Sequence, residues 1–236
     1  MMRSLAISLT LLILFSCSQA PEPRPDLAAV HIVTGYDTTG SRITKAGGSI
    51  TDGYVDSLHI TRVKFMLGNI RLSGKKQDSS LTTVLLRQDP IVYIIDTSIR
   101  ILNSANVEYG LYNRLTLDFY KFTDSAALFY KDDMRYRDFY RDGTMNTVLI
   151  EGKRFIFGAE QEFTYLSDPK GALSFDLEPP LSVSAELKGS ITLRFDPAKV
   201  FLTEQGVLDP SYAENSFRIA QAVLNAFRTQ VTHPVR

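Results

Sequence analysis

Tryptophan is absent from this 236-residue chain, and cysteine occurs once, as Cys17. One cysteine excludes a disulfide within the chain, so the folded part must be stabilised by packing alone. Charge of one sign is lacking too, because 26 Lys and Arg balance 26 Asp and Glu. Nucleic-acid binders usually carry a basic face, and membrane-surface proteins a cationic helix, and neither is recognisable here. We therefore expect no nucleic-acid partner.

The chain also lacks an apolar run long enough to span a bilayer, which takes about 20 residues. Its longest run, residues 5–15, follows the basic Arg3 and has the length of a signal-peptide core. The next residues complete the quartet Leu14-Phe15-Ser16-Cys17, which resembles the bacterial lipobox. The resemblance implies that residues 1–16 are a lipoprotein signal peptide and that lipidated Cys17 begins the mature protein. The alternative is an ordinary secretory signal cleaved after Ala20.

Residues 17–26 contain three prolines and almost no large apolar side chain, which is typical of an extended tether. We expect this tether to join the lipid on Cys17 to one domain over residues 27–236. A single acyl chain holds a protein to a membrane only marginally, so two or three chains are expected. Ser18 is not the aspartate that often signals inner-membrane retention. The expected location is the bacterial cell envelope, at the outer membrane.

The remaining pattern is that of short strands. Three apolar runs, 83–86, 91–95 and 99–102, recur at about eight-residue intervals, as in a sandwich or barrel. The alternation of apolar and polar residues changes phase at Thr61-Arg62, which predicts a β-bulge. Residues 109–120 alternate most clearly, with Leu111 on the same parity as Leu115 and Leu117. A turn is expected at residues 151–153.

One helix is expected, over residues 211–229. Asp209 could cap it, Pro210 suits a first helical position, and Phe217, Val223 and Phe227 share a face. A single helix cannot supply the crossovers that a parallel sheet needs. The predicted fold is therefore mainly β, an antiparallel immunoglobulin-like β-sandwich with a C-terminal α-helix.

Residues 124–146 interrupt this rhythm with tyrosines among charged side chains. Tyr130, Tyr136, Arg137 and Tyr140 are the candidate binding residues, because aromatic and arginine side chains are favoured at recognition surfaces. The alternative is that the tyrosines cover the rim of the sandwich. The segment also holds four aspartates that could donate oxygens to calcium, but their spacing is not that of an EF-hand loop, and a solvated loop is the expectation: Asp132, Asp133, Asp138 and Asp142.

Metal and catalytic motifs are scarce. The three histidines are His31, His59 and His233, and only a pairing of His31 with His59 would make a metal site conceivable. No nucleophile elbow, phosphate-binding loop or dinucleotide fingerprint occurs. Carboxylates two residues apart, at 160 and 162 and at 176 and 178, are the weak basis for a hydrolase. We expect no cofactor, no bound metal and no catalytic residue.

Two family resemblances can be given. Leu193-Arg194-Phe195-Asp196, Val200-Phe201 and Leu208-Asp209-Pro210, followed by a helix, are similar to uncharacterised bacterial secreted β-sandwich lipoproteins. This implies a closing strand, a short helical link and a helix that ends the domain. Asn69-Ile70-Arg71-Leu72 more weakly resembles a strand of the methanobactin-associated periplasmic copper-binding sandwich proteins. Those proteins use histidine and a modified tryptophan near the metal, so the missing tryptophan speaks against copper here.

Together these features predict a non-catalytic envelope lipoprotein. It would be held to the membrane through Cys17 and would serve binding, adhesion or assembly with an envelope protein or polymer. Two alternatives stay open: a periplasmic carrier of a metal or small ligand, and a hydrolase with paired carboxylates.

Overall fold

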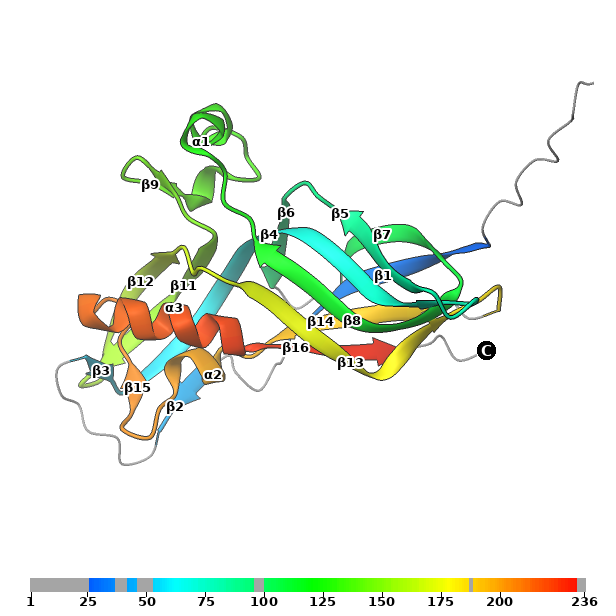
Figure 1. The fold of residues 1–236 in the computed structure, drawn as a ribbon. Coiled ribbons are helices and arrows are strands. Elements are labelled where there is room, and N and C mark those ends of the chain that lie inside the picture. The colour runs from blue at the N-terminus through cyan, green and yellow to red at the C-terminus, as the bar shows by residue number, and fades with distance from the viewer. Residues whose placement is uncertain (1–25, 37–41, 46–52, 96–99, 187–188, 233–236) are drawn as a thin grey trace, which may run out of the picture.

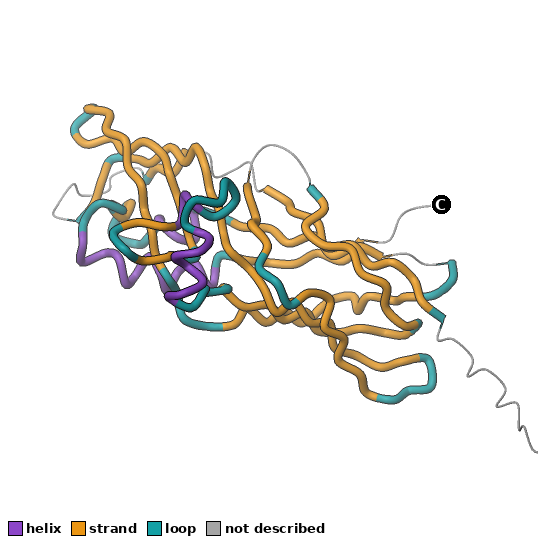
Figure 2. Tube along the Cα trace, turned by 90° about the horizontal axis from the view of Figure 1, so that it is seen from above, coloured by secondary structure: helices purple, strands orange, loops and turns teal. Residues whose placement is uncertain are grey.

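The computed structural model describes residues 26–36, 42–45, 53–95, 100–186 and 189–232. Most of this part is strand, as predicted, and the helices are few and short. The long strands run lengthwise, and the helices gather toward one end (Figures 1 and 2). None of the helices in the described ranges is long and apolar enough to cross a membrane. The signal peptide, Cys17 and most of the tether lie outside these ranges.

The larger sheet is built around one long strand, β4 (Ser57–Lys76). Its strands follow the order β12-β11-β4-β8-β13, and three shorter strands also pair with β4. The bounds are β2 (Arg42–Thr44), β5 (Leu81–Arg87), β6 (Ile91–Ile95), β8 (Gly110–Phe119), β11 (Val148–Ile156), β12 (Ala159–Ser167) and β13 (Ala172–Val183).

The smaller sheet has the order β16-β14-β1-β7. Its strands are β1 (Leu27–Tyr36), β7 (Ile101–Glu108), β14 (Gly189–Phe195) and β16 (Phe227–Thr232). Strands β1 and β14 pair in parallel, so the prediction of wholly antiparallel strands is wrong at this pair. Most of the chain lies between the two strands and supplies the long connection that parallel pairing needs.

The two sheets pack against each other around a shared hydrophobic core. The ring of Phe65, on β4, lies 4.8 Å from those of Phe195 and Phe227, on the smaller sheet, and these rings meet edge to face. Edge-to-face contacts are favourable for aromatic rings beyond the area that they bury. The molecule is thus sandwich-like, with aromatic side chains in its centre.

The predicted bulge at Thr61-Arg62 is confirmed. Glu151 of β11 pairs with Arg62 and Gly152 pairs with Ile60, so Thr61 is the extra residue on β4. The predicted turn at residues 151–153 is wrong, because β11 runs through it and ends near Phe157 instead. Polar residues there indicated a turn, but they mark the bulged part of a continuous strand.

The predicted helix over 211–229 is shorter than expected. It is preceded by the 3-10 turn η3 (Ala213–Asn215), and α3 spans Ser216–Asn225, with Asn215 rather than Asp209 at its N-cap. Phe227 belongs to β16, because it pairs with Phe195 and completes the core. The helix therefore does not end the domain. The remaining elements nearby are α2 (Ala198–Phe201) and the small pair β3 (Tyr54–Val55) and β15 (Val207–Leu208).

Candidate functional site

Residues 121–147 form an insertion between β8 and β11, which stands on the outer face of the larger sheet (Figure 1). Its elements are α1 (Asp124–Tyr130), η2 (Arg137–Phe139), β9 (Tyr140–Arg141) and β10 (Thr144–Met145). Thr123 caps α1 by accepting a hydrogen bond at 3.4 Å from the amide of Ala126, as threonine commonly does at helix starts.

The insertion has a small hydrophobic core of its own. This second core contains Met66, Phe122, Ala127, Tyr136, Phe139, Met145 and Leu149. Met66 and Leu149 come from β4 and β11, so the insertion packs directly on the sheet. For the same reason residues 63–67 of β4 are buried on both faces.

An ion cluster also fixes the insertion to the sheet. Lys64 Nζ, on β4, donates to Asp138 Oδ2 at 2.7 Å, and Arg62 donates to the same oxygen. Arg62 also reaches Glu151 Oε2 of β11 at 3.0 Å. Burial by itself would raise the pKa of the Asp138 carboxyl, but hydrogen bonds and charge from Lys64 and Arg62 outweigh it and hold this pKa below its ordinary value. Asp138 is therefore ionised at neutral pH.

A groove of about 460 Å³ lies between the insertion and the sandwich. Its volume falls in the range of small-molecule sites. Apolar and cationic side chains line it together, and no acidic side chain is among them. The lining residues are Thr34, Lys64, Arg87, Pro90, Ile91, Val92, Arg100, Ile101, Leu102, Met134, Arg135 and Tyr136.

The cations of the groove differ in how far they are neutralised. Arg135 donates from Nε and Nη2 to the two carboxylate oxygens of Asp133, at 3.0 and 2.8 Å. These hydrogen bonds lower the pKa of Asp133 to about 2. The Arg135 guanidinium also lies 5.1 Å from the ring centre of Tyr136. Arg87 donates to the backbone carbonyl of Asp89 at 3.3 Å, and no ion pair joins it to a carboxylate among the described residues.

The predicted binding residues have different places in this arrangement. Tyr136 is buried and lines the groove, and its hydroxyl donates to the carbonyl of Pro90 at 3.4 Å. Tyr130 is half-buried and stacks on Phe122, with 4.8 Å between ring centres. Tyr140 is half-buried as well, and Arg137 is exposed. The tyrosines thus pack in or against the second core of the insertion, and their role in binding stays a prediction.

Three other apolar side chains of the insertion face solvent. Leu128, Phe129 and Met134, here called the insertion tip, are 59, 79 and 78% exposed. Sequence reasoning missed them, although a signal existed. Residues 126–130 are all apolar or aromatic, which is more than one face of a short helix can bury.

In comparisons with known proteins, no family model, curated protein or solved structure matches the chain. Any function proposed for the protein must therefore be argued from its own sequence and structure.

The histidine pair considered for a metal is not brought together. His31 lies on β1 opposite Ser104 and Ser190, in the smaller sheet, and His59 lies exposed on β4 in the larger one. His233 is outside the described residues. Within the described ranges no three His, Cys, Asp or Glu side chains gather as a metal site would need. Of the four aspartates considered for calcium, Asp132, Asp133 and Asp138 pair with cations.

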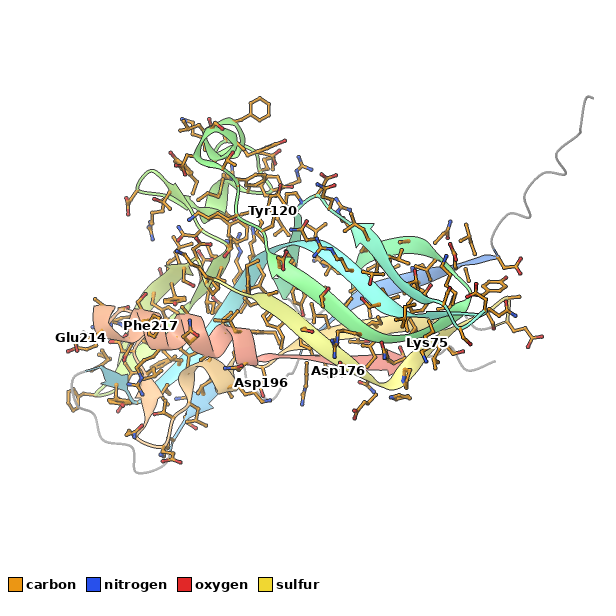
Figure 3. The ribbon with its side chains drawn as sticks, in the orientation of Figure 1. Lys75, Tyr120, Asp176, Asp196, Glu214 and Phe217 are labelled. Carbon is orange, nitrogen blue, oxygen red and sulfur yellow. The ribbon has the colours of Figure 1, made fainter. Side chains whose placement is uncertain are left out.

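The paired carboxylates lie on solvated strand surfaces. Glu160 and Glu162 are exposed on β12, and Glu160 accepts from Lys153 at 2.6 Å. Asp176, which Figure 3 labels on β13, accepts from Arg114 at 2.9 Å. Asp196 follows β14 and accepts a hydrogen bond from the amide of Ala198 at 3.0 Å, so it caps the next turn. None of these carboxylates lines the groove.

Proposed function

We propose that the protein is a non-catalytic, lipid-anchored protein of the bacterial envelope that binds an envelope protein or polymer through the insertion. The anchor is supported by the lipobox-like quartet that ends in Cys17 and by the absence of any other cysteine. The first strand begins at Leu27, so a short tether fits between lipid and domain. We also propose an immunoglobulin-like arrangement for the sandwich, which the two facing sheets of mostly antiparallel strands support.

The observation that carries the binding role is the insertion tip. Leu128, Phe129 and Met134 expose large apolar surfaces on a segment that is itself held by a core and by the Lys64–Asp138 ion pair. Leu128 and Phe129 are neighbours on α1, and large exposed apolar side chains that form one patch mark interaction sites. A rigid platform lowers the entropy cost of binding, because little has to be ordered when the partner arrives.

The alternative of a periplasmic carrier is supported by one observation, the groove between the insertion and the sandwich. A small amphipathic anion would place its charge near Arg87 and its apolar part against Ile101 and Met134. This second candidate shares Met134 with the insertion tip, but its ligand enters the groove, whereas a partner would cover Leu128 and Phe129. The substitution Arg87→Glu should abolish binding of such an anion and leave contacts at the tip intact.

The anchor is tested by mass spectrometry of the mature protein and by incorporation of radiolabelled palmitate. We expect lipid on Cys17 in the wild-type protein and none in Cys17→Ser. An unmodified mature protein beginning after Ala20 would refute the anchor and would favour an ordinary secretory signal.

The binding role is tested by photo-crosslinking in the producing cells. A photoreactive amino acid at Phe129 is compared with one at Phe217, which is 74% exposed on α3, away from the insertion. We expect discrete adducts from position 129, lost when Met134→Ser is added, and none from position 217. Equal adducts at both positions, or none at either, would argue against a partner at the tip.

A further inference from the structure

A second exposed apolar row lies at the other end of the sandwich. Lys75 of β4 pairs with Leu81 of β5 on one side and with Leu111 of β8 on the other. Leu81 is 83% exposed, Leu111 is 50% exposed, and Lys75 is exposed between them. We call these three residues the tether-end row. Two leucines beside one lysine make a surface that is apolar with a single positive charge.

Leu111 is exposed because β8 carries a bulge. Arg114 pairs with Ser73 and Tyr112 pairs with Gly74, so Asn113 is an extra residue and the parity of the strand changes there. Tyr112 takes the buried position, and Leu111 faces out. The sequence pattern placed Leu111 on the buried parity, and this prediction is wrong for that reason.

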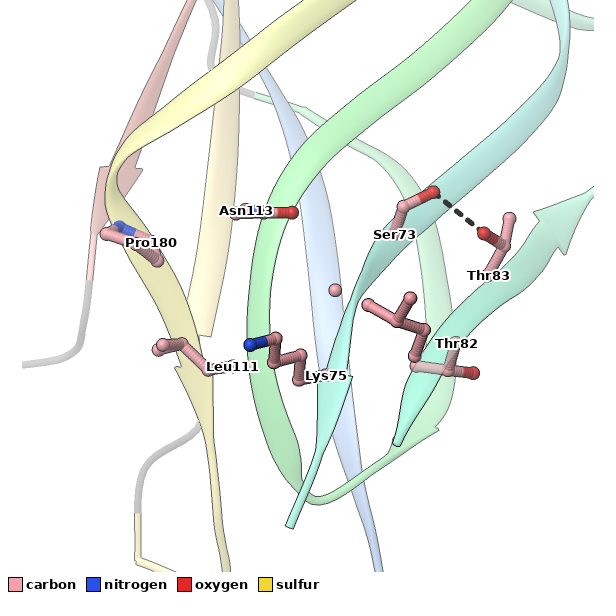
Figure 4. A pocket seen from close by; sticks show the side chains of 9 residues that line it. Ser73, Lys75, Thr82, Thr83, Leu111, Asn113 and Pro180 are labelled. Carbon is pink, nitrogen blue, oxygen red and sulfur yellow. Dashed lines mark hydrogen bonds between the residues drawn. The ribbon is translucent and has the colours of Figure 1, made fainter. Parts of the chain in front are cut away.

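The backbone beneath the row is tightly held. A Cβ on Gly74 would lie 2.3 Å from the carbonyl oxygen of Leu111, and one on Gly110 would lie 2.3 Å from that of Lys75. The strands can approach this closely only because both residues are glycine. Next to the row, Ser73 and Thr83 are joined by a hydrogen bond of 3.0 Å between their hydroxyls (Figure 4). The row and its neighbours line an open groove of about 510 Å³.

The tether leaves the domain at this same end. Leu27 pairs with Glu108 at the end of β7, and Lys76 Nζ lies 2.7 Å from Glu108 Oε2. The amide of Tyr109 donates to the carbonyl of Asp26 at 3.0 Å. Figure 3 shows Lys75 at the end where β1 begins, far from Phe217. Residues 18–26 could span at most about 30 Å when fully extended, so this end of the domain stays near whatever holds Cys17.

We infer that the tether-end row contacts the lipid surface to which Cys17 is attached. Leu81 and Leu111 enter the boundary between headgroups and acyl chains, and the Lys75 ammonium stays among anionic headgroups. This inference rests on the proposed lipid attachment and adds the orientation of the domain. Apolar side chains flanked by lysine are the combination that seats protein surfaces at this boundary.

The absence of tryptophan makes a direct test possible, because each introduced tryptophan is the only one in the protein. The mature lipidated protein is reconstituted into vesicles of phosphatidylethanolamine and phosphatidylglycerol, with or without lipids brominated on their acyl chains. Leu81→Trp and Leu111→Trp report on the row. Phe217→Trp is the matched control, since that side chain is similarly exposed at the far end.

We expect the tryptophan emission of Leu81→Trp and Leu111→Trp to shift to the blue on vesicles and to be mostly quenched by brominated lipids. The emission wavelength and intensity of Phe217→Trp should not change. If the protein floats with vesicles and Leu81→Trp emits as in water, the inference is overturned while the lipid anchor stands. Equal quenching at all three positions would overturn it as well. If the wild-type protein floats no better than Cys17→Ser, the anchor itself fails and the inference falls with it.

Discussion

Lys64 and Asp138 form an ion pair of 2.7 Å that joins the central strand of the larger sheet to the insertion. Lys64 is buried, although its position on the outer face of β4 would expose it if the insertion were absent. Its charge is tolerated there because Asp138 lies opposite, and Asp138 is shared with Arg62. The insertion is therefore part of the folded unit, and its attachment can be tested by changing one carboxylate.

Asp138→Ala should lower the free energy of unfolding by about 2 kcal/mol, because it leaves buried Lys64 without its hydrogen-bond acceptor. Urea unfolding measures the loss, and hydrogen exchange should rise mainly in residues 121–147. Asp132→Ala is the control, since Asp132 is exposed and lies 3.9 Å from Lys131, so its effect should stay below about 0.5 kcal/mol. Similar losses for the two variants would contradict the docking role of Asp138.

The same pair should weaken in acid. The pKa of Asp138 is held below its ordinary value of 3.8, so its contribution to stability is complete above that value and is lost as the pH falls through the lower, folded-state pKa. We expect the difference in unfolding free energy between the wild-type protein and Asp138→Asn to be constant near neutral pH and to shrink below about pH 4. A difference that does not change down to about pH 2.5 would show that folding does not lower the pKa of Asp138.

Particular elements show how far the sequence could predict this structure. The bulge at Thr61 was predictable, because apolar residues change parity there and only an extra residue can keep both halves of β4 facing the core. The position of α3 was predictable from the spacing of its apolar residues. Its end was not, because Phe227 fits the helical pattern equally well and only its pairing with Phe195 assigns it to a strand.

The candidate surfaces were harder to predict for a related reason. Leu111 and Tyr112 are both apolar, so the sequence could not show that the bulge at Asn113 would bury the tyrosine. Lys64 is the kind of residue expected on the exposed face of a half-buried strand, yet the insertion covers the outer face of residues 63–67. In both cases burial depends on partners distant in the sequence, which a local pattern does not contain.

Tyr93 provides a test of how the sheets are joined. Its hydroxyl lies 3.0 Å from the carbonyl oxygen of Leu193 and 3.2 Å from that of Gly35, and burial raises the pKa of this hydroxyl well above its ordinary value. Tyr93→Phe should cost about 1 kcal/mol of unfolding free energy, since the buried hydrogen bond is lost while the ring remains. Tyr54→Phe removes a weak, exposed contact of 3.5 Å with Arg218 and should change stability by less than about 0.5 kcal/mol. If both variants behave alike, the bond between the sheets contributes nothing measurable.

Gly152 of β11 should be far less replaceable than Gly158, which follows the strand. A Cβ at this position would lie 2.2 Å from the backbone carbonyl oxygen of His59, and neither strand can yield without breaking pairs on both sides of the bulge. Gly152→Ala should therefore lower the unfolding free energy by about 3 kcal/mol. Gly158→Ala is the comparison, because nothing lies within 4 Å of its Cβ and only its φ of +78° is unfavourable for alanine, which costs about 1 kcal/mol. Unfolding in urea should rank Gly152→Ala as the more damaging change, and the reverse order would mean that β11 and β4 do not approach as closely at the bulge.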